Sequence, residues 1–227
     1  MADAAVIFDV DGVLLELTAA EEDVFFFPFE QRYGLTGISR DWNSYKIRND
    51  DNIIDEIIAR HGIPAGEKSA IIADYLTVLQ QRLERGTIAT AIVPGATQLL
   101  RNLQANFSVG VATANFLSAA KLRLQQANLW NIVSAHAHGA EGGGHKRQTV
   151  ARAIETLKLP KARIVYVGDN VNDVDAGVSN GVHFIGFSTS PDRLRELRYS
   201  GAIHTSNNHL ETFRLISHLL GGKSKRT

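Results

Sequence analysis

The chain has 227 residues with 24 basic and 24 acidic side chains, so its net charge is zero and its pI is about 7.1. This balance disfavours a nucleic-acid-binding protein, because a basic face is the usual footprint of that class. The absence of cysteine excludes disulfides, thiol nucleophiles and cysteine-ligated zinc. No apolar run reaches the roughly 18 residues of a membrane span, and Met1-Ala2-Asp3 lacks the basic start of a signal peptide. We therefore expect a cytoplasmic enzyme or binding protein that acts neither on nucleic acid nor at a membrane.

The first predicted element is the apolar run 6–8, which leads into Asp9, Val10, Asp11 and Gly12. Such a run is typical of a buried parallel strand. Carboxylates at its end are costly unless a positive group meets them. In an open α/β sheet, the carboxyl ends of the strands form the ligand-binding crevice. Side-chain alternation should put Asp9 and Asp11 on the same side. Taken alone, the pair could also be a solvated acidic turn.

Residues 16–88 differ in pattern from the rest of the chain, since they predict helices at 19–32, 50–61 and 65–85. Pro28 should end or kink the first of these helices. The phenylalanines around it should form the core of this segment rather than a ligand-binding box. A crossover between two strands needs far fewer residues. We therefore interpret 16–88 as an inserted helical domain, and 1–15 together with 89–227 as one α/β domain.

From residue 92 onward, strands and helices alternate. Strands are predicted at 108–112, 132–134, 163–167 and 182–185, and helices at 94–106, 116–128, 146–158, 171–180, 190–199 and 207–219. This alternation predicts a mostly parallel, doubly wound sheet. The basic tail 223–226 should be disordered.

A second polar segment, Thr113-Ala114-Asn115, follows the strand predicted at 108–112. A hydroxyl and an amide just before a helix can donate hydrogen bonds to an anion at the helix N-terminus. The alternative is an ordinary helix cap, because Thr and Asn are common in that position.

A third segment, Gly144-His145-Lys146, puts a lysine at the start of a helix. The positive end of the helix dipole repels a cation there. The placement therefore suggests a compensating anion, although a solvated lysine is the alternative.

A fourth segment runs from a strong strand into Gly168, Asp169 and Asp173. Two acids four residues apart at the start of a helix lie near each other. Clustered with Asp9 and Asp11, they would repel one another strongly without a cation. An all-oxygen cluster suits Mg²⁺. The alternative is a pair of solvated loop acids.

Taken in this order, the four segments resemble the four motifs of the haloacid dehalogenase-like (HAD) hydrolase superfamily. Residues 9–14 are similar to D-x-D-G-[TV]-[LV], and residues 168–173 to G-D-x-x-x-D. The third motif departs from the usual Gly-Lys-Pro, because His145 precedes Lys146 and Arg147 replaces the proline. Arg147 is therefore the alternative motif cation. The position of the insert resembles the helical C1-type cap of the phosphoglycolate phosphatase and β-phosphoglucomutase-like branch.

The resemblance implies a Rossmann-like core with this cap, and a Mg²⁺-dependent phosphatase acting on a small phosphorylated metabolite. It implies that Asp9 is the nucleophile and Asp11 the general acid and base. Residues implied to bind the phosphoryl group are Thr113, Asn115 and Lys146. The metal would be held by Asp9, the backbone carbonyl of Asp11 and Asp169, with Asp173 supporting them. The protein would be a monomer or a homodimer.

Two alternatives to a phosphatase stay open, a phosphomutase of the β-phosphoglucomutase type and a non-catalytic HAD-fold regulatory protein. Dehalogenation is disfavoured, because Asp11 is not needed for it.

Arg48 lies in the segment before the helix predicted at 50–61, where related caps place a specificity loop. It could bind a carboxylate or a second phosphate of the substrate in a bidentate fork. The alternative is a solvated charge beside a helix.

Three histidines raise the possibility of a zinc site, namely His136, His138 and His145. Zinc needs three or four ligands, and no further ligand has suitable spacing. We do not expect a zinc site here.

Overall fold

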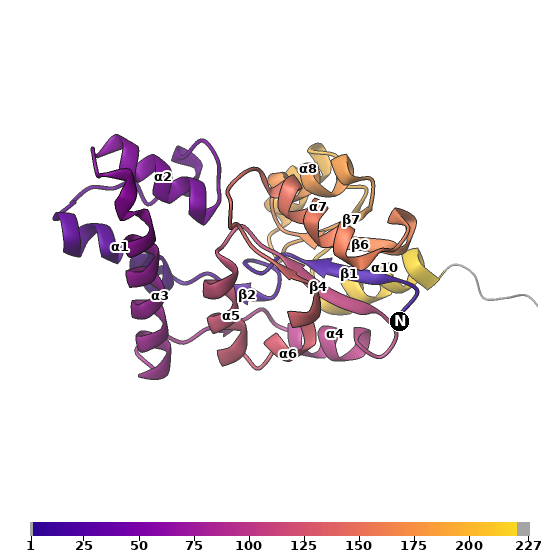
Figure 1. Cartoon of the computed structure of the whole chain (residues 1–227). Helices are drawn as coiled ribbons and strands as arrows, with labels where there is room; N and C mark the ends of the chain where they lie inside the picture. The colour runs from indigo at the N-terminus through magenta and orange to yellow at the C-terminus, as the bar shows by residue number, and fades with distance from the viewer. Residues whose placement is uncertain (1, 222–227) are drawn as a thin grey trace, which may run out of the picture.

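A computed structural model of the chain describes residues 2–221, so the basic tail 223–226 lies outside the described residues (Figure 1). Six parallel strands form one sheet in the order β5-β4-β1-β6-β7-β8. The strands are β1 (Ala5–Phe8), β4 (Ser108–Ala112), β5 (Ala137–His138), β6 (Ile164–Gly168), β7 (His183–Phe187) and β8 (His204–Ser206). This topology confirms the predicted α/β class with its doubly wound parallel sheet.

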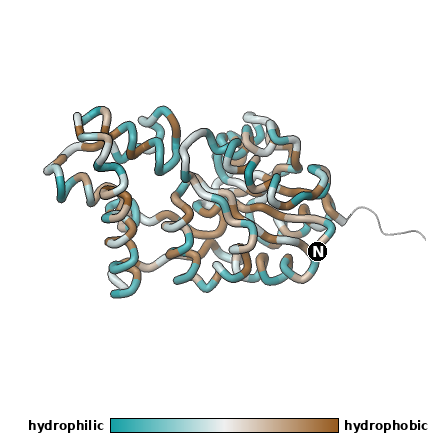
Figure 2. Tube along the Cα trace, viewed as in Figure 1, coloured by the Kyte–Doolittle hydropathy of each residue, from teal (hydrophilic) through white to brown (hydrophobic). Residues whose placement is uncertain are grey.

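Side-chain alternation along β1 assigns the two faces of the sheet to two sets of helices. Val6 and Phe8 pack on one face with α4 (Ala96–Leu103), α5 (Leu117–Gln126), α6 (Trp130–Val133) and α10 (His209–Gly221). Ile7 packs on the other face with α7 (Lys146–Leu157), α8 (Val171–Asn180) and α9 (Pro191–Tyr199). Figure 1 shows α4 and α6 below the sheet and α7 and α8 above it. Because both faces are covered, the central strands are mostly apolar, and the sheet region of Figure 2 is largely brown and pale.

A helical insertion follows β1. It contains α1 (Ala19–Tyr33), α2 (Asp50–Arg60) and α3 (Lys68–Glu84), on the left of Figure 1. These helices share a separate hydrophobic cluster that includes Phe25, Phe26 and Phe29, which agrees with the predicted core. The chain leaves and returns through a two-stranded antiparallel ribbon of β2 (Leu15–Glu16) and β3 (Ala91–Ile92). The insertion is consistent with a C1-type cap. The exact boundaries at 15/16 and 88/89 stay a prediction.

Three local predictions were wrong or incomplete. Residues 132–134 are not a strand, since they continue α6 and a 3-10 turn, and the strand is β5. The short apolar run there belongs to a helix that packs on the core. A run of this length fits a buried helix as well as a buried strand, so its sequence does not distinguish them. Strand β8 was missed because its sequence, His-Thr-Ser, is polar. Pro28 does not end α1, which runs to Tyr33.

The helix continues through Pro28 because its neighbours are anchored. A proline inside a helix removes one hydrogen bond and destabilises it by about 3 kcal/mol. Phe25, Phe26 and Phe29 on the same helix are buried in the insertion core, and full burial of one such side chain contributes about 1.5–3 kcal/mol. Packing therefore offsets the local preference.

In residues 2–221, no helix is both long and apolar enough to cross a membrane.

Candidate active site

The site forms where the three central strands end at the same edge of the sheet. Phe8, the last residue of β1, is level with Val111 of β4 and Val167 of β6. The polar residues that follow these strands, Asp9, Thr113 and Asp169, therefore emerge side by side. Because this edge carries the carboxyl ends of parallel strands, it is the expected place for a ligand.

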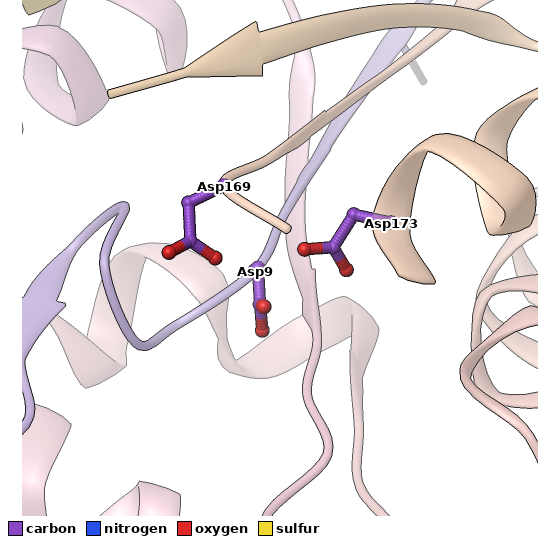
Figure 3. A group of neighbouring side chains, drawn as sticks. All are labelled: Asp9, Asp169 and Asp173. Carbon is purple, nitrogen blue, oxygen red and sulfur yellow. The ribbon is translucent and has the colours of Figure 1, made fainter. Parts of the chain in front are cut away.

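Three carboxylates gather at this edge, from Asp9, Asp169 and Asp173 (Figure 3). Each offers one oxygen, and these oxygens lie within 4.8 Å of one another. Asp9 and Asp173 are 8% and 1% exposed, so water screens their charges little.

Lys146 supplies the nearest positive charge. Its ammonium Nζ lies 2.7 Å from Asp9 Oδ1 and 3.2 Å from Asp173 Oδ1, and its side chain is 6% exposed. The anions inferred from a lysine at a helix start are therefore Asp9 and Asp173. Arg147, the alternative cation, is exposed.

Asp173 is held on both of its oxygens. The Tyr166 hydroxyl donates to Oδ1, and the backbone N–H of Asn170 donates to Oδ2 at 3.1 Å. With Lys146 also beside Oδ1, this carboxylate is fixed in position. Asp173 therefore suits a supporting role in the acidic cluster.

The electrostatics of the cluster favour a further cation. Burial and the charge of Asp173 together raise the pKa of Asp169 to about 7, against the opposing effect of Lys146. Burial also raises the pKa of Asp9 well above its usual value, although Lys146 lowers it in part. Burial lowers the pKa of Lys146, but Asp173 and Asp9 outweigh this effect and raise it. One ammonium does not neutralise three carboxylates, and an all-oxygen donor set suits a hard divalent ion. The cluster therefore fits a Mg²⁺ site.

Gly12 lets the loop after β1 approach Asp169. Its φ is +72°, in the left-handed region, and an added Cβ would lie 2.2 Å from Asp169 Oδ2. Any side chain here would collide with the acidic cluster, so the motif needs glycine for both backbone conformation and space.

Thr113 and Asn115 follow β4 beside the cluster. Thr113 is 1% exposed, and its hydroxyl donates to Asn115 Oδ1 at 3.0 Å and accepts from the Asn115 N–H at 3.1 Å. Both line the same cavity as Asp9. Neither caps α5 with its side chain, because the N-cap residue of that helix is Phe116.

Asp11 does not join the acidic cluster. We expected side-chain alternation to continue from Asp9 to Asp11. Strand β1 instead ends at Phe8, so the alternation of a strand does not apply to Asp11. Its Oδ1 instead forms an ion pair at 2.7 Å with Nη1 of Arg123, a residue of α5. Asp11 still lines the cavity with Asp9, and its side chain is 25% exposed.

The cavity has a volume of about 360 Å³ and lies between the strand ends and the insertion. Its wall from the insertion includes Phe25, Trp42, Arg48, Ile53 and Tyr75. Arg48 is half-buried, and its guanidinium donates to Asn43 Oδ1 at 3.0 Å. The structure thus places Arg48 on the wall that the insertion contributes to the cavity.

Helix α2 is tied to the loops that carry the site. The N–H of Asp50 donates to the Ala114 carbonyl at 2.9 Å, and Asp50 Oδ2 accepts from the Phe116 N–H at 2.7 Å. Asn52 Oδ1 accepts from the Gly144 N–H at 2.8 Å. These bonds hold the insertion over the cavity.

Asp50→Asn should stabilise the protein more at pH 8 than at pH 5. Burial raises the pKa of Asp50 to about 7, above its ordinary 3.8, so the folded state holds this proton more tightly than the unfolded state. The stability that this proton contributes is complete below pH 4 and is lost as pH rises through 7. An amide keeps the acceptor for Phe116 without that loss. We expect the free energy of unfolding of the variant to exceed that of wild type by about 2 kcal/mol more at pH 8 than at pH 5. Urea unfolding at the two pH values measures this difference.

Asp51→Asn is the matched control, because Asp51 lies on the same helical turn but pairs with Lys68 at 2.9 Å. An Asp50→Asn gain that is equal at both pH values would contradict the burial argument.

The three histidines are not part of the acidic cluster at the sheet edge. Among the described residues, the group that could hold a metal consists of aspartates, and it includes none of His136, His138 and His145. His138 Nε2 instead contacts the Thr156 hydroxyl at 3.1 Å.

Sequence analysis missed Arg123, Glu21 and Tyr166. Arg123 follows Ala119 and Ala120 by one helical turn, so it lies on the buried face of α5, and this spacing was an available signal. Glu21 follows Thr18 in the T-x-x-E pattern of a capping box, which the structure contains. Tyr166 lies inside a strand and gave no signal of its contact with Asp173.

Comparisons with known proteins agree with this geometry. The family model described as haloacid dehalogenase-like hydrolase matches residues 4–181. No curated protein sequence matches the chain.

Several solved structures share the fold, among them the following three. CbbY from Rhodobacter sphaeroides in complex with phosphate has a TM-score of 0.73 and 19% identity, covering 92% of this chain and 95% of its own. A predicted phosphatase from Clostridium acetobutylicum has a TM-score of 0.71 and 17% identity, covering 96% and 100%. A predicted phosphoglycolate phosphatase from Haemophilus somnus has a TM-score of 0.70 and 14% identity, covering 93% and 97%.

Because the family model matches residues 4–181, most of its length, the chain belongs to the haloacid dehalogenase-like hydrolase family.

Proposed function

We propose that the protein is a Mg²⁺-dependent phosphatase that hydrolyses a small phosphate monoester through an aspartyl-phosphate on Asp9. The observation that carries this proposal is the buried Asp9 carboxylate, 2.7 Å from Lys146 Nζ and clustered with two further acids at the strand ends. An ammonium and a divalent ion around one carboxylate suit a dianionic phosphoryl group, because charge neutralisation dominates phosphoryl transfer. The structure of CbbY, which shares the fold, contains phosphate.

In the first step, an oxygen of Asp9 bonds to phosphorus while the bond from phosphorus to the leaving alcohol breaks. Asp11 donates a proton to that alcohol. In the second step, Asp11 takes a proton from a water that attacks phosphorus, which releases phosphate and regenerates Asp9. Thr113, Asn115 and Lys146 bind the phosphoryl oxygens throughout.

The metal would be held by Asp9, Asp169 and the backbone carbonyl of Asp11, with Asp173 fixing the shell. When bound, it supplies positive charge to the phosphoryl oxygens. The fit rests on the donor set, since Asp9 is buried and Asp169 is half-buried, and the pKa values of both are raised in the absence of such a charge.

A panel of phosphorylated sugars, acids and nucleotides tests this proposal. The members of the panel that the protein hydrolyses should be hydrolysed with Mg²⁺ and not with EDTA. Asp169→Ala should lower turnover by at least about 100-fold, and excess Mg²⁺ should rescue it only in part. Asp192→Ala is the control, because the Asp192 side chain is 83% exposed on α9. Full activity in EDTA would contradict the metal assignment. Isomerisation of a sugar phosphate in the same panel would favour the mutase.

Arg48→Ala should raise KM for the best substrate of that panel by at least about tenfold, or about 1.4 kcal/mol. The reason is that the catalytic groups bind only phosphate, whereas Arg48 lies on the cavity wall that the insertion contributes and can contact the rest of the molecule. Hydrolysis of 4-nitrophenyl phosphate should be nearly unchanged. Lys46→Ala is the matched control, two residues away and exposed. Equal losses on both esters would show that Arg48 does not recognise the substrate.

A further inference from the structure

Arg123 occupies an unusual place for an arginine, because it is 3% exposed and lies among apolar residues of α5. A buried guanidinium is strongly unfavourable unless carboxylates or carbonyls surround it. Here it reaches three acceptors within residues 11–21, one each from the turn after β1, from β2 and from the start of α1. They are Asp11 Oδ1 at 2.7 Å, Glu21 Oε1 at 2.7 Å and the Glu16 carbonyl at 3.1 Å.

The contact with Glu21 fixes the guanidinium itself. Glu21 is 4% exposed, and its Oε2 accepts from the Thr18 N–H at 3.0 Å and the Thr18 hydroxyl at 2.9 Å. The carboxylate is therefore held at the first turn of α1, in the insertion. Glu16 lies in β2, the strand that connects the core to the insertion. Arg123 thus joins α5 of the core to the segment that carries α1.

The contact with Asp11 fixes the carboxylate of that residue. In the described part of the chain, Asp11 Oδ1 is buried and accepts no hydrogen bond of good geometry, so Arg123 is the charge that balances it. The side chain of Asp11 is nevertheless 25% exposed and lines the cavity. One oxygen is therefore anchored away from solvent, while the accessible part of the side chain faces the space that a substrate would occupy.

We propose that Arg123 is a positioning residue that orients the carboxylate of Asp11 toward the leaving group. Because Arg123 also pairs with Glu21, this orientation depends on how α1 packs against α5. The inference rests on the proposed role of Asp11 in proton transfer. A general acid must lie within hydrogen-bond reach of the leaving oxygen, and small misplacements reduce rates strongly. Asp11 lies in the turn after β1, so the ion pair with Arg123 supplies an orientation that strand geometry does not.

The test compares two substrates whose need for proton transfer differs. Glycerol 2-phosphate has a poor alkoxide leaving group, whereas 4-nitrophenyl phosphate leaves without protonation. Arg123→Met should lower kcat/KM on glycerol 2-phosphate by at least about 30-fold and on 4-nitrophenyl phosphate by less than about threefold, because kcat/KM reports phosphoryl transfer to Asp9 and not the later hydrolysis that both esters share. In the Asp11→Asn background, Arg123→Met should cost less than about threefold on either substrate, since the residue to be positioned is absent.

Further variants separate positioning from folding. Arg123→Met leaves Glu21 without its cation, so the double variant Arg123→Met, Glu21→Gln removes that buried charge if the single variant unfolds. Arg123→Lys should restore only part of the rate, because an ammonium cannot bridge both carboxylates as a planar fork does. Glu21→Gln alone should give a smaller loss with the same leaving-group dependence. Arg163→Met is the matched control, because Arg163 ties backbone carbonyls of Asp3 and Leu220. Urea unfolding gives the folded fraction of each variant.

Equal losses of kcat/KM on the two substrates, or an undiminished loss in the Asp11→Asn background, would overturn the role of Arg123 while leaving the phosphatase intact. A wild-type protein without Mg²⁺-dependent hydrolysis of either ester would overturn the proposed function, and this inference with it.

Discussion

Asp9→Asn is expected to lower kcat by at least about 10⁴-fold on every phosphate ester that the protein hydrolyses. The amide oxygen is a poor nucleophile, and an acyl phosphate cannot form on it. The substitution keeps the shape of the side chain, and its oxygen can still accept from the Val10 N–H that now lies 2.7 Å from Oδ1. The loss should therefore appear in turnover, with both leaving groups affected equally.

The fold of the Asp9→Asn variant should survive. Burial and the neighbouring acids raise the pKa of Asp9, so a neutral amide relieves repulsion from Asp173 and Asp169. In EDTA, its urea midpoint should equal or exceed that of wild type. Asp192→Asn serves as the control for a generic charge change, because Asp192 is solvent-exposed. Turnover above about 1% of the wild-type rate in saturating Mg²⁺ would remove Asp9 as the nucleophile.

The position of the site at the carboxyl edge of the sheet was predictable, because the same short segments predict both the strands and the acidic residues that follow them. Residues 6–8 and 164–167 are apolar runs that end in acids, and parallel strands must bring such ends together. The same logic placed Thr113 beside Asp9. The helix dipole suggested an anionic partner for Lys146 but left a solvated lysine as the alternative, and the structure places Asp9 and Asp173 beside its ammonium.

What sequence reasoning missed depends on contacts between distant residues. Arg123 and Glu21 lie 102 positions apart in the chain. Each has an ordinary local explanation, as a helical arginine and as a capping glutamate. Only the packing of α5 against the start of α1 turns them into a buried pair. The continuous helix through Pro28 has the same origin, since tertiary burial of the neighbouring phenylalanines overrides a local preference.

Asp11→Asn should separate proton transfer from nucleophilic attack. A positioned general acid typically contributes about 10²- to 10⁴-fold. We expect the rate of phosphoryl transfer to Asp9 to fall by a factor in that range on glycerol 2-phosphate and by much less on 4-nitrophenyl phosphate. Asp9→Asn should instead lower the rate equally on both esters. Burst kinetics should show aspartyl-phosphate accumulating with the nitrophenyl ester, because the second step also loses the base that activates water.

The structural change in Asp11→Asn is confined to one ion pair. Arg123 keeps Glu21 Oε1 at 2.7 Å and the Glu16 carbonyl at 3.1 Å, so its buried charge remains balanced. The variant should therefore unfold at nearly the wild-type urea concentration, and a rate loss cannot be ascribed to misfolding. Asp175→Asn, an exposed change on α8 that leaves the acidic cluster intact, is the matched control. If the two esters lost activity equally and no burst appeared, Asp11 would not be the proton donor, and its contact with Arg123 would serve stability alone.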